Sequence, residues 1–419
     1  MKKFKYGKEI FALFLSMLFL LYNCSNDDSY TETEQNNFTT HLLYPEGIKD
    51  DAKGNFTLLL KEKNSGTEYK FENETEKSIT KHIISGNYQI NIEGYVVVEN
   101  DTLNVYGLIE NIQINTTNNN LTIPLYLKNI NKDGDFVIQE VFFTGTIYPT
   151  GKKYDSGKYF KIYNNSNRTL YADGLLICLS EFNPWTKRDV TPNIFSSSFP
   201  VSAILMLPGK GKDYPVEPGK SIVVCDNAIN HKTTNPNAYN LTPAAVIGKA
   251  GTQYLFEFPN TDNPKLGEVD NPEVPNAKVI FTTMKLNTVY LHNRGAETYA
   301  IARLGENISL NEYLNQYKYD YSYLNEAGNI FKRSVYKIPN EWIADAANVS
   351  TPGKHNWLVI SPSIDRGWTY CSLNDKDITR FDTCIKRKIK EKNANGIDIL
   401  QDTNNSTEDF IPRAKLFLK

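Results

Sequence analysis

The fold class follows from one stretch, Ile83-Ile84-Ser85-Gly86-Asn87-Tyr88-Gln89-Ile90-Asn91-Ile92-Glu93-Gly94. Its apolar residues Tyr88, Ile90 and Ile92 are each followed by a polar residue, so an extended chain places the two kinds on opposite faces. Gly86-Asn87 predicts a turn before this strand, because both residue types tolerate a positive φ. The stretch therefore predicts a β-strand with one buried and one polar face.

Comparable stretches recur through residues 38–130. Turn residues punctuate them about every ten positions, which is typical of short antiparallel strands. Further strands are expected at residues 56–60, 69–71, 95–98, 103–108, 112–115 and 121–127. The spacing predicts a small β-sandwich. The Gly-x-Tyr-x-Ile-x-Ile pattern of residues 86–92 resembles prealbumin-like and carboxypeptidase-regulatory-like domains, and this resemblance implies a stalk or spacer.

A second unit is predicted over residues 131–412, with strands near 136–143 and 159–166. The runs at 159–175, 216–224 and 401–410 resemble the lamin-tail domain, and this resemblance implies an immunoglobulin-like sandwich. Lys161 stands where that family often has Glu, on a face expected to point outward. The whole stretch resembles an uncharacterised family of Bacteroidetes surface lipoproteins that couples both units. The expected fold class is all-β: two Ig-like sandwiches, the second lamin-tail-like with long insertions and little helix.

Segments between the expected strands are candidates for a functional surface. Residues 186–215 and 231–275 are rich in Pro, Asn, Lys and Gly and are too long for hairpin loops. Residues 339–347 are expected to form a short helix with Pro in its first turn. Tyrosine rings can stack on a sugar or peptide or pack within a sheet. The candidate contact residues are Tyr313, Tyr317, Tyr319, Tyr321 and Tyr323.

The first 23 residues predict a signal peptide. Four lysines precede an apolar run over residues 10–21 that is too short to span a membrane, and Cys24 follows it. The segment, with the polar residues 25–28 after it, resembles the signal of Bacteroidetes lipoproteins. The resemblance implies acylation of Cys24 and an outer-membrane, surface-exposed location; the alternative is an ordinary secretory signal with an incidental Cys24. Residues 24–37 are expected to be a flexible tether.

Composition and motifs argue against several functions. The chain carries a formal charge of −2, and loss of the signal's four Lys and one Glu leaves −5, so no nucleic-acid partner is expected. The five histidines show no metal-binding spacing, and no nucleophile elbow or phosphate-binding loop is present. Residues 402–406 lack the glycine and final acid of a calcium loop. We therefore expect no metal, no cofactor and no enzyme activity.

After Cys24, four cysteines remain, an even number in a chain expected to be exported. Two disulfides are compatible with three pairings, and the alternative is four buried thiols. The residues are Cys178, Cys225, Cys371 and Cys384.

The predicted function is a lipid-anchored cell-surface binding or structural protein, which contacts its partner through insertions of the second domain, chiefly residues 186–215 and 311–323. The partner would be an outer-membrane transporter, a glycan or a host protein, besides the outer membrane itself. Two alternatives stay open: a ligand-capture accessory of a TonB-dependent uptake system, and a surface hydrolase with an unrecognised carboxylate site.

Overall fold

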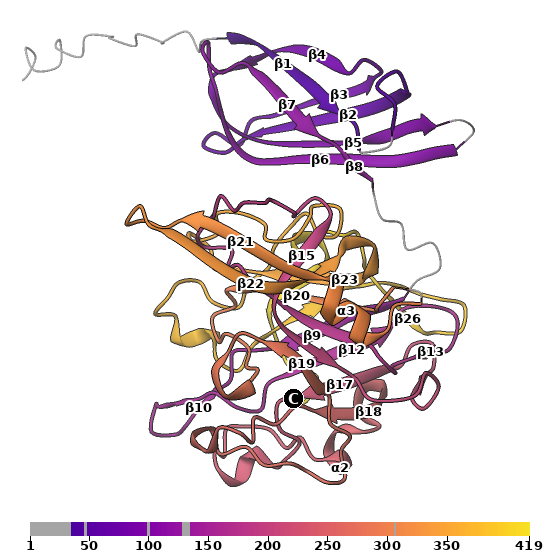
Figure 1. Ribbon diagram of the computed structural model, residues 1–419, viewed down its shortest axis with the longest axis vertical. Helices are drawn as coiled ribbons and strands as arrows, with labels where there is room; N and C mark the ends of the chain where they lie inside the picture. Colours follow the sequence, from indigo (N-terminus) through magenta and orange to yellow (C-terminus); the bar gives the residue numbers. More distant parts are fainter. Residues whose placement is uncertain (1–34, 46–47, 99–100, 128–134, 306) are drawn as a thin grey trace, which may run out of the picture.

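Two β-rich domains make up the computed structural model, which describes residues 35–45, 48–98, 101–127, 135–305 and 307–419 (Figure 1). The predicted signal peptide, Cys24 and most of the predicted tether lie outside these residues. Strand β1 begins at Gln35, within the predicted tether, and Asn36 is already buried. Among the described residues, no helix has both the length and the apolar character needed to cross a membrane.

Two facing sheets form the first domain. The smaller has the order β4 (Ser78–Ile84), β1 (Gln35–Leu43) and β7 (Asn120–Pro124), with β1 and β7 parallel. The larger has the order β3 (Glu68–Glu74), β2 (Lys53–Glu62), β5 (Gly86–Val98), β6 (Asp101–Ile114) and β8 (Tyr126–Leu127). Apolar side chains from both sheets meet in one core, which confirms a β-sandwich.

The alternation predicted for the opening stretch is confirmed. Tyr88, Ile90 and Ile92 of β5 are fully buried in the core between the sheets. Gly86 has a different role from the predicted one, because it does not adopt a positive φ. A side chain there would place its Cβ 2.6 Å from Cγ of Glu62. Glycine is therefore required by the close approach of Glu62, which accepts a hydrogen bond from Asn87 N at 3.0 Å.

The second domain is also built on two large sheets. One has the order β18 (Thr252–Glu257), β17 (Ser221–Cys225), β12 (Tyr159–Asn164), β9 (Phe136–Phe142), β24 (Cys384–Arg387) and β27 (Phe410–Ala414). The other has the order β21 (Lys318–Leu324), β22 (Ile330–Pro339), β15 (Ser198–Met206), β14 (Leu176–Ser180), β20 (Glu297–Ala302) and β23 (Ile343–Val349), with β19 (Lys278–Thr282) paired to β15. Apolar residues of both sheets share one core, so the all-β prediction is confirmed.

Short elements connect these sheets. The small strand pairs are β10 (Thr146–Ile147) with β11 (Lys153–Tyr154), β13 (Leu170–Tyr171) with β16 (Pro215–Val216), and β25 (Ile389–Lys392) with β26 (Asp398–Leu400). The α-helices are α2 (Pro243–Val246), α3 (Leu310–Gln316) and α4 (Ser406–Asp409). The 3₁₀ turns are η1 (His231–Thr233), η2 (Lys249–Gly251), η3 (Pro264–Leu266), η4 (Lys285–Asn287), η5 (Asn340–Trp342) and η6 (Ile378–Arg380).

Three sequence predictions need correction here. Residues 186–215 are not a loop throughout, because β15 lies within them and pairs with β14 and β22. Residues 339–347 form no α-helix: after the turn η5, the chain enters β23, which pairs with β20. Lys161 does not point outward but is buried, with its Nζ 2.8 Å from Ala250 O and 4.3 Å from the Phe417 ring centroid. The C-terminal residues cover that face, and the domain extends past 412 to the buried Leu416.

The four described cysteines are free thiols, so the disulfide alternative is not supported by the structure. Each lies inside the second domain, in strand interiors or beneath loops, where it packs as a small apolar residue. Burial raises the pKa of all four thiols and keeps them protonated. They are Cys178, Cys225, Cys371 and Cys384.

Candidate functional site

A cleft of about 980 Å³ lies between the two domains. One wall is the outer face of the first domain's larger sheet, and the other consists of three loops of the second domain, at residues 353–356, 366–370 and 403–408. Small-molecule sites usually occupy ~300–1,000 Å³, often at domain interfaces. This cleft therefore has the size and the position of a ligand site.

The strand alternation of the first domain builds the sheet wall. Because Ile90 and Ile92 point into the sandwich core, Gln89 and Asn91 must point out of it, and both line the cleft. The same argument places Thr57 on β2 there. The polar face that the sequence predicted for β5 is therefore a cleft wall rather than a free surface.

A buried carboxylate holds two of the loops together. Asp365 accepts hydrogen bonds from Ser406 N at 2.7 Å, Gly367 N at 3.2 Å and Asn348 N at 3.2 Å, and from the Ser406 hydroxyl. Burial raises the pKa of Asp365 to about 6. Thr407 adds a second link, because its Oγ1 lies 3.0 Å from Trp368 N and 2.9 Å from Trp368 O. The loop wall is thus fixed from beneath.

Arg387 anchors the same wall at its other end. Its guanidinium contacts Asp345, Asp402 and Asp409, and its Nε donates to Ile138 O at 2.8 Å. Asp409 in turn accepts from Thr403 N at 2.9 Å. Residues 402–409 are therefore held by internal hydrogen bonds and by one buried cation.

Two side-chain contacts join the domains across the cleft. Arg366 forms an ion pair with Glu93 and lies 5.4 Å from the ring centroid of Tyr106, which is 2 % exposed. His355 Nε2 lies 3.2 Å from Glu110 Oε1. These contacts fix the two walls relative to each other.

Aromatic side chains occupy the loop wall. The rings of His355 and Trp368 stack at 4.7 Å with an interplanar angle of 17°, and Tyr370 lies 6.1 Å from Trp368. Trp368 and Tyr370 are half-buried and line the cleft. Because His355 covers one face of the indole, the ring is held in a fixed orientation at the cleft wall.

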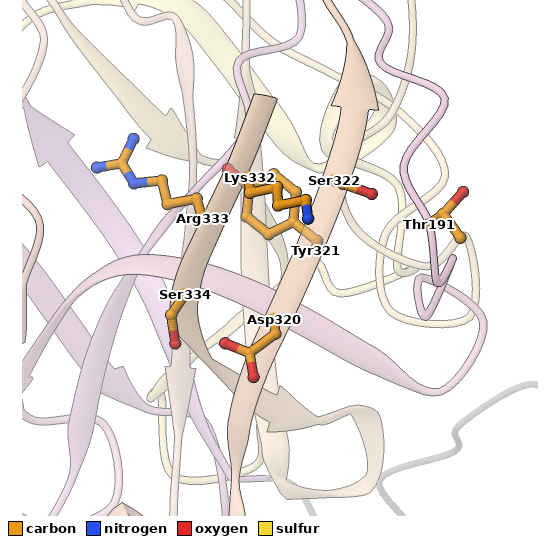
Figure 2. A pocket seen from close by; sticks show the side chains of 7 residues that line it. All are labelled: Thr191, Asp320, Tyr321, Ser322, Lys332, Arg333 and Ser334. Atoms are coloured by element: carbon orange, nitrogen blue, oxygen red, sulfur yellow. The ribbon is translucent and has the colours of Figure 1, made fainter. Parts of the chain in front are cut away.

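A second hollow, of about 490 Å³, lies on the hairpin β21–β22 (Figure 2). Asp320 and Ser322 come from β21, Lys332 and Arg333 from β22, and Thr191 from a separate loop. That loop bridges the outer edge of β21 through Thr191 N to Ser322 O at 2.8 Å and Ser322 N to Thr191 O at 3.0 Å. This second hollow is lined by one hairpin and one loop, and its volume is half that of the cleft.

The predicted tyrosines do not form one exposed set. Tyr313, Tyr319 and Tyr321 are buried, and their rings pack in the second domain. Tyr321 also lines the hollow on the β21–β22 hairpin (Figure 2). The Tyr321 hydroxyl also donates to Glu181 Oε1 at 2.6 Å. Tyr317 and Tyr323 are half-buried, and their role as partner contacts stays a prediction.

The buried Asp226 and the half-buried Glu268 lie away from the cleft. Asp226 accepts from Gly157 N at 3.1 Å and Lys158 N at 3.0 Å, and Glu268 accepts from Asn260 N at 2.7 Å. Burial raises the pKa of both acids. Their backbone partners show that they tie loops together. Within the described residues, no group of three His, Cys, Asp or Glu side chains is placed to bind a metal.

Sequence reasoning missed the main cleft residues, Arg366, Trp368 and His355. The only local signal was the aromatic pair in Gly367-Trp368-Thr369-Tyr370, which by itself also fits an ordinary strand. The pairing of residues 353–408 with the sheet of residues 57–111 depends on the packing of the two domains.

Comparisons with known proteins bear on the second domain and on the fold. No curated protein is significantly similar to the chain in sequence. The fold is similar to that of a DUF4876 family protein from Bacteroides thetaiotaomicron, at 22 % identity and a TM-score of 0.54, covering 91 % of this chain and 95 % of that one. A candidate cell adhesion protein from Bacteroides eggerthii matches at 11 % identity over 73 % of this chain and 80 % of that one, but a TM-score of 0.17 supports no conclusion.

The expected resemblance to an uncharacterised family is confirmed over part of the second domain, and the lipoprotein character expected with it stays a prediction. Residues 217–416 match the model of a family described as "Protein of unknown function (DUF4876)". The matched region includes all three cleft loops. Residues 217–416 are therefore similar to the DUF4876 family.

Proposed function

We propose that this chain is a non-catalytic binding protein of the cell surface whose ligand site is the cleft between its two domains. The observation that carries the proposal is a cleft of about 980 Å³, with one wall from each domain. The buried Asp365 and Arg387 hold the loop wall in place before any ligand arrives. A site organised in advance loses less entropy when it binds.

The contacts of the cleft carboxylates favour binding over catalysis. Glu93 is paired with Arg366, and Glu110 contacts His355. A hydrolase needs two carboxylates that face the same bond, one of them with a raised pKa. Asp365, which also has a raised pKa, is buried beneath the loop wall and hydrogen-bonded to Ser406, and it does not line the cleft. Asp226 and Glu268, whose pKa is raised too, are hydrogen-bonded to backbone groups outside the cleft.

The surface location is proposed from the N-terminal sequence, which lies outside the described residues. An acylated Cys24 would hold the chain to the outer membrane, and residues 25–34 would leave the two domains accessible. Cys24→Ser should move the protein from the membrane fraction to the soluble fraction. An unchanged distribution would overturn the anchor.

The cleft is tested by blocking it. Because the four described cysteines are buried, a maleimide-linked polymer should react selectively with Thr57→Cys, on the sheet wall, in a Cys24→Ser background. Lys212→Cys, on an exposed loop away from the cleft lining, is the matched control. Binding of neutral oligosaccharides, acidic oligosaccharides and peptides is then measured by calorimetry. We expect the label to abolish binding only at position 57; a bound ligand insensitive to that label, or no bound ligand, would overturn the proposed site.

A further inference from the structure

We propose that the cleft binds a neutral oligosaccharide, an inference that rests on the proposed function and specifies its ligand class. Three features of the lining point to this class: a fixed aromatic platform, unpartnered amide and hydroxyl side chains on the facing walls, and nearly balanced charge.

The aromatic platform lies on the loop wall. Trp368 is held on one side by the His355 ring and at its backbone by Thr407, and Tyr370 continues the aromatic surface 6.1 Å away. The weakly polar C–H faces of a sugar ring pack well on a flat indole or phenol ring, while the sugar hydroxyls stay free for hydrogen bonds. A rigid ring is more useful here than a mobile one, because less side-chain entropy is lost on binding.

Hydrogen-bonding groups without protein partners line both walls. Among the described residues, the side chains of Thr57, Gln89, Asn91, Asn111 and Asn356 make no hydrogen bond to another protein group, yet all line the cleft. An amide offers both donors and an acceptor, and so matches a hydroxyl, which does the same. A ligand with many hydroxyl groups would satisfy these side chains, whereas an apolar ligand would leave them unpaired and desolvated.

The charge of the lining argues against a polyanion. Its basic residues Lys61 and Lys70 pair with Glu68 and Glu72 beside the cleft, and Arg366 pairs with Glu93 inside it. The remaining ionised residues are Lys63, Glu110 and Glu408. Binding of nucleic acid or of an acidic polysaccharide depends on an excess of cations, which this lining does not provide.

A peptide also fits the cleft poorly. Extended peptides usually add to a sheet edge, where backbone groups are unpaired, but most of this wall is a sheet face, because β2 and β5 each pair with a neighbour on both sides. β6 pairs with β5 along its length and with β8 only at Val105 and Tyr106. Among the described residues that line the cleft, Leu59 is the only one with an aliphatic side chain. The lining therefore offers no pocket for the aliphatic side chains of a peptide.

Calorimetry on the full chain with defined probes tests the ligand class. The probes are oligomers prepared from mannan, β-glucan and galactan for neutral sugars, oligogalacturonate for acidic sugars, and a mixed tetradecapeptide library for peptides. We expect at least one neutral probe to bind, with affinity that varies little between 50 and 300 mM salt. Trp368→Ala should weaken this binding at least about tenfold, as expected for an aromatic anchor. Trp342→Ala, a half-buried tryptophan outside the cleft lining whose ring packs on Tyr313 and Tyr317, should leave it unchanged.

A second variant, on the sheet wall, tests the proposal even if Trp368→Ala fails to fold. Asn91→Ala lies on the sheet of the first domain, away from Trp368, and should also weaken binding of the neutral probe. Binding of only the acidic or only the peptide probes, still blocked by the label at position 57, would overturn a neutral oligosaccharide as the ligand class while leaving the cleft as a binding site. Neutral binding unaffected by both Trp368→Ala and Asn91→Ala would overturn the proposal as well.

Discussion

Replacing Arg387 by Ala should strongly destabilise the second domain. The guanidinium is 1 % exposed and contacts two carboxylates that are themselves buried, Asp345 and Asp409, at 4 % and 1 % exposure. It also lies 4.5 Å from the Phe410 ring. Removing one partner of a buried ion pair leaves uncompensated charge and costs about 3–5 kcal/mol. This is a large part of the ~5–15 kcal/mol that stabilises a typical domain.

Urea unfolding followed by tryptophan fluorescence measures this loss. All four tryptophans lie in the second domain, so the signal reports that domain alone. The control Lys390→Ala removes a cation whose side chain is 64 % exposed and 3.7 Å from Glu391, and it should change stability by no more than about 0.5 kcal/mol. The pair Arg387→Met with Asp345→Asn should recover part of the loss, because it removes a buried charge together with its partner. A cost below about 1 kcal/mol for Arg387→Ala would refute this account.

Three further outcomes are expected. Arg366→Ala should weaken the coupling of the domains by about 1–3 kcal/mol, because it removes the cation beside Tyr106 and the ion pair with the half-exposed Glu93; hydrogen exchange of β6 amides should increase. Asp365→Asn removes a carboxyl whose raised pKa stabilises the folded chain below about pH 4, and this stabilisation is lost as the pH rises through about 6. Over that range, the free energy of unfolding of the wild type should therefore fall relative to that of Asp365→Asn by up to about 3 kcal/mol. A thiol reagent should label Cys178, Cys225, Cys371 and Cys384 only after the protein unfolds. If these cysteines stay unlabelled in unfolded but unreduced protein, they form disulfides.

The strands of the first domain could be predicted because period-two alternation is a local property. The apolar face of β5 needed no knowledge of its neighbours. In the second domain, β15 was missed because Pro200 and the surrounding Ser residues are typical of loops. Pro200 is tolerated in the strand next to β22, where the sheet packing outweighs local preference.

The burial of polar residues was the feature that the sequence predicted least well. Lys161 lies on a strand in the middle of a sheet, and alternation alone assigns it to solvent. Only the later chain, at Ala250 and Phe417, shows that this face is covered. Burial lowers the pKa of Lys161 to about 8, which is the expected effect of moving an ammonium out of water. A second layer of loops over a polar face leaves no local trace in the sequence.

The cleft depends on both domains in a way that constrains its function. Its sheet wall, with Gln89 and Asn91, belongs to a domain that resembles a spacer in sequence, and its loop wall belongs to the region that is similar to the DUF4876 family. The two meet through Arg366 and His355, which come from the loops and contact side chains of the sheet. A spacer would need only an exposed, charged surface on this face, whereas unpartnered amides held opposite an ordered tryptophan suit recognition of a ligand. We therefore propose that the first domain supplies half of the proposed binding site and is not only a stalk.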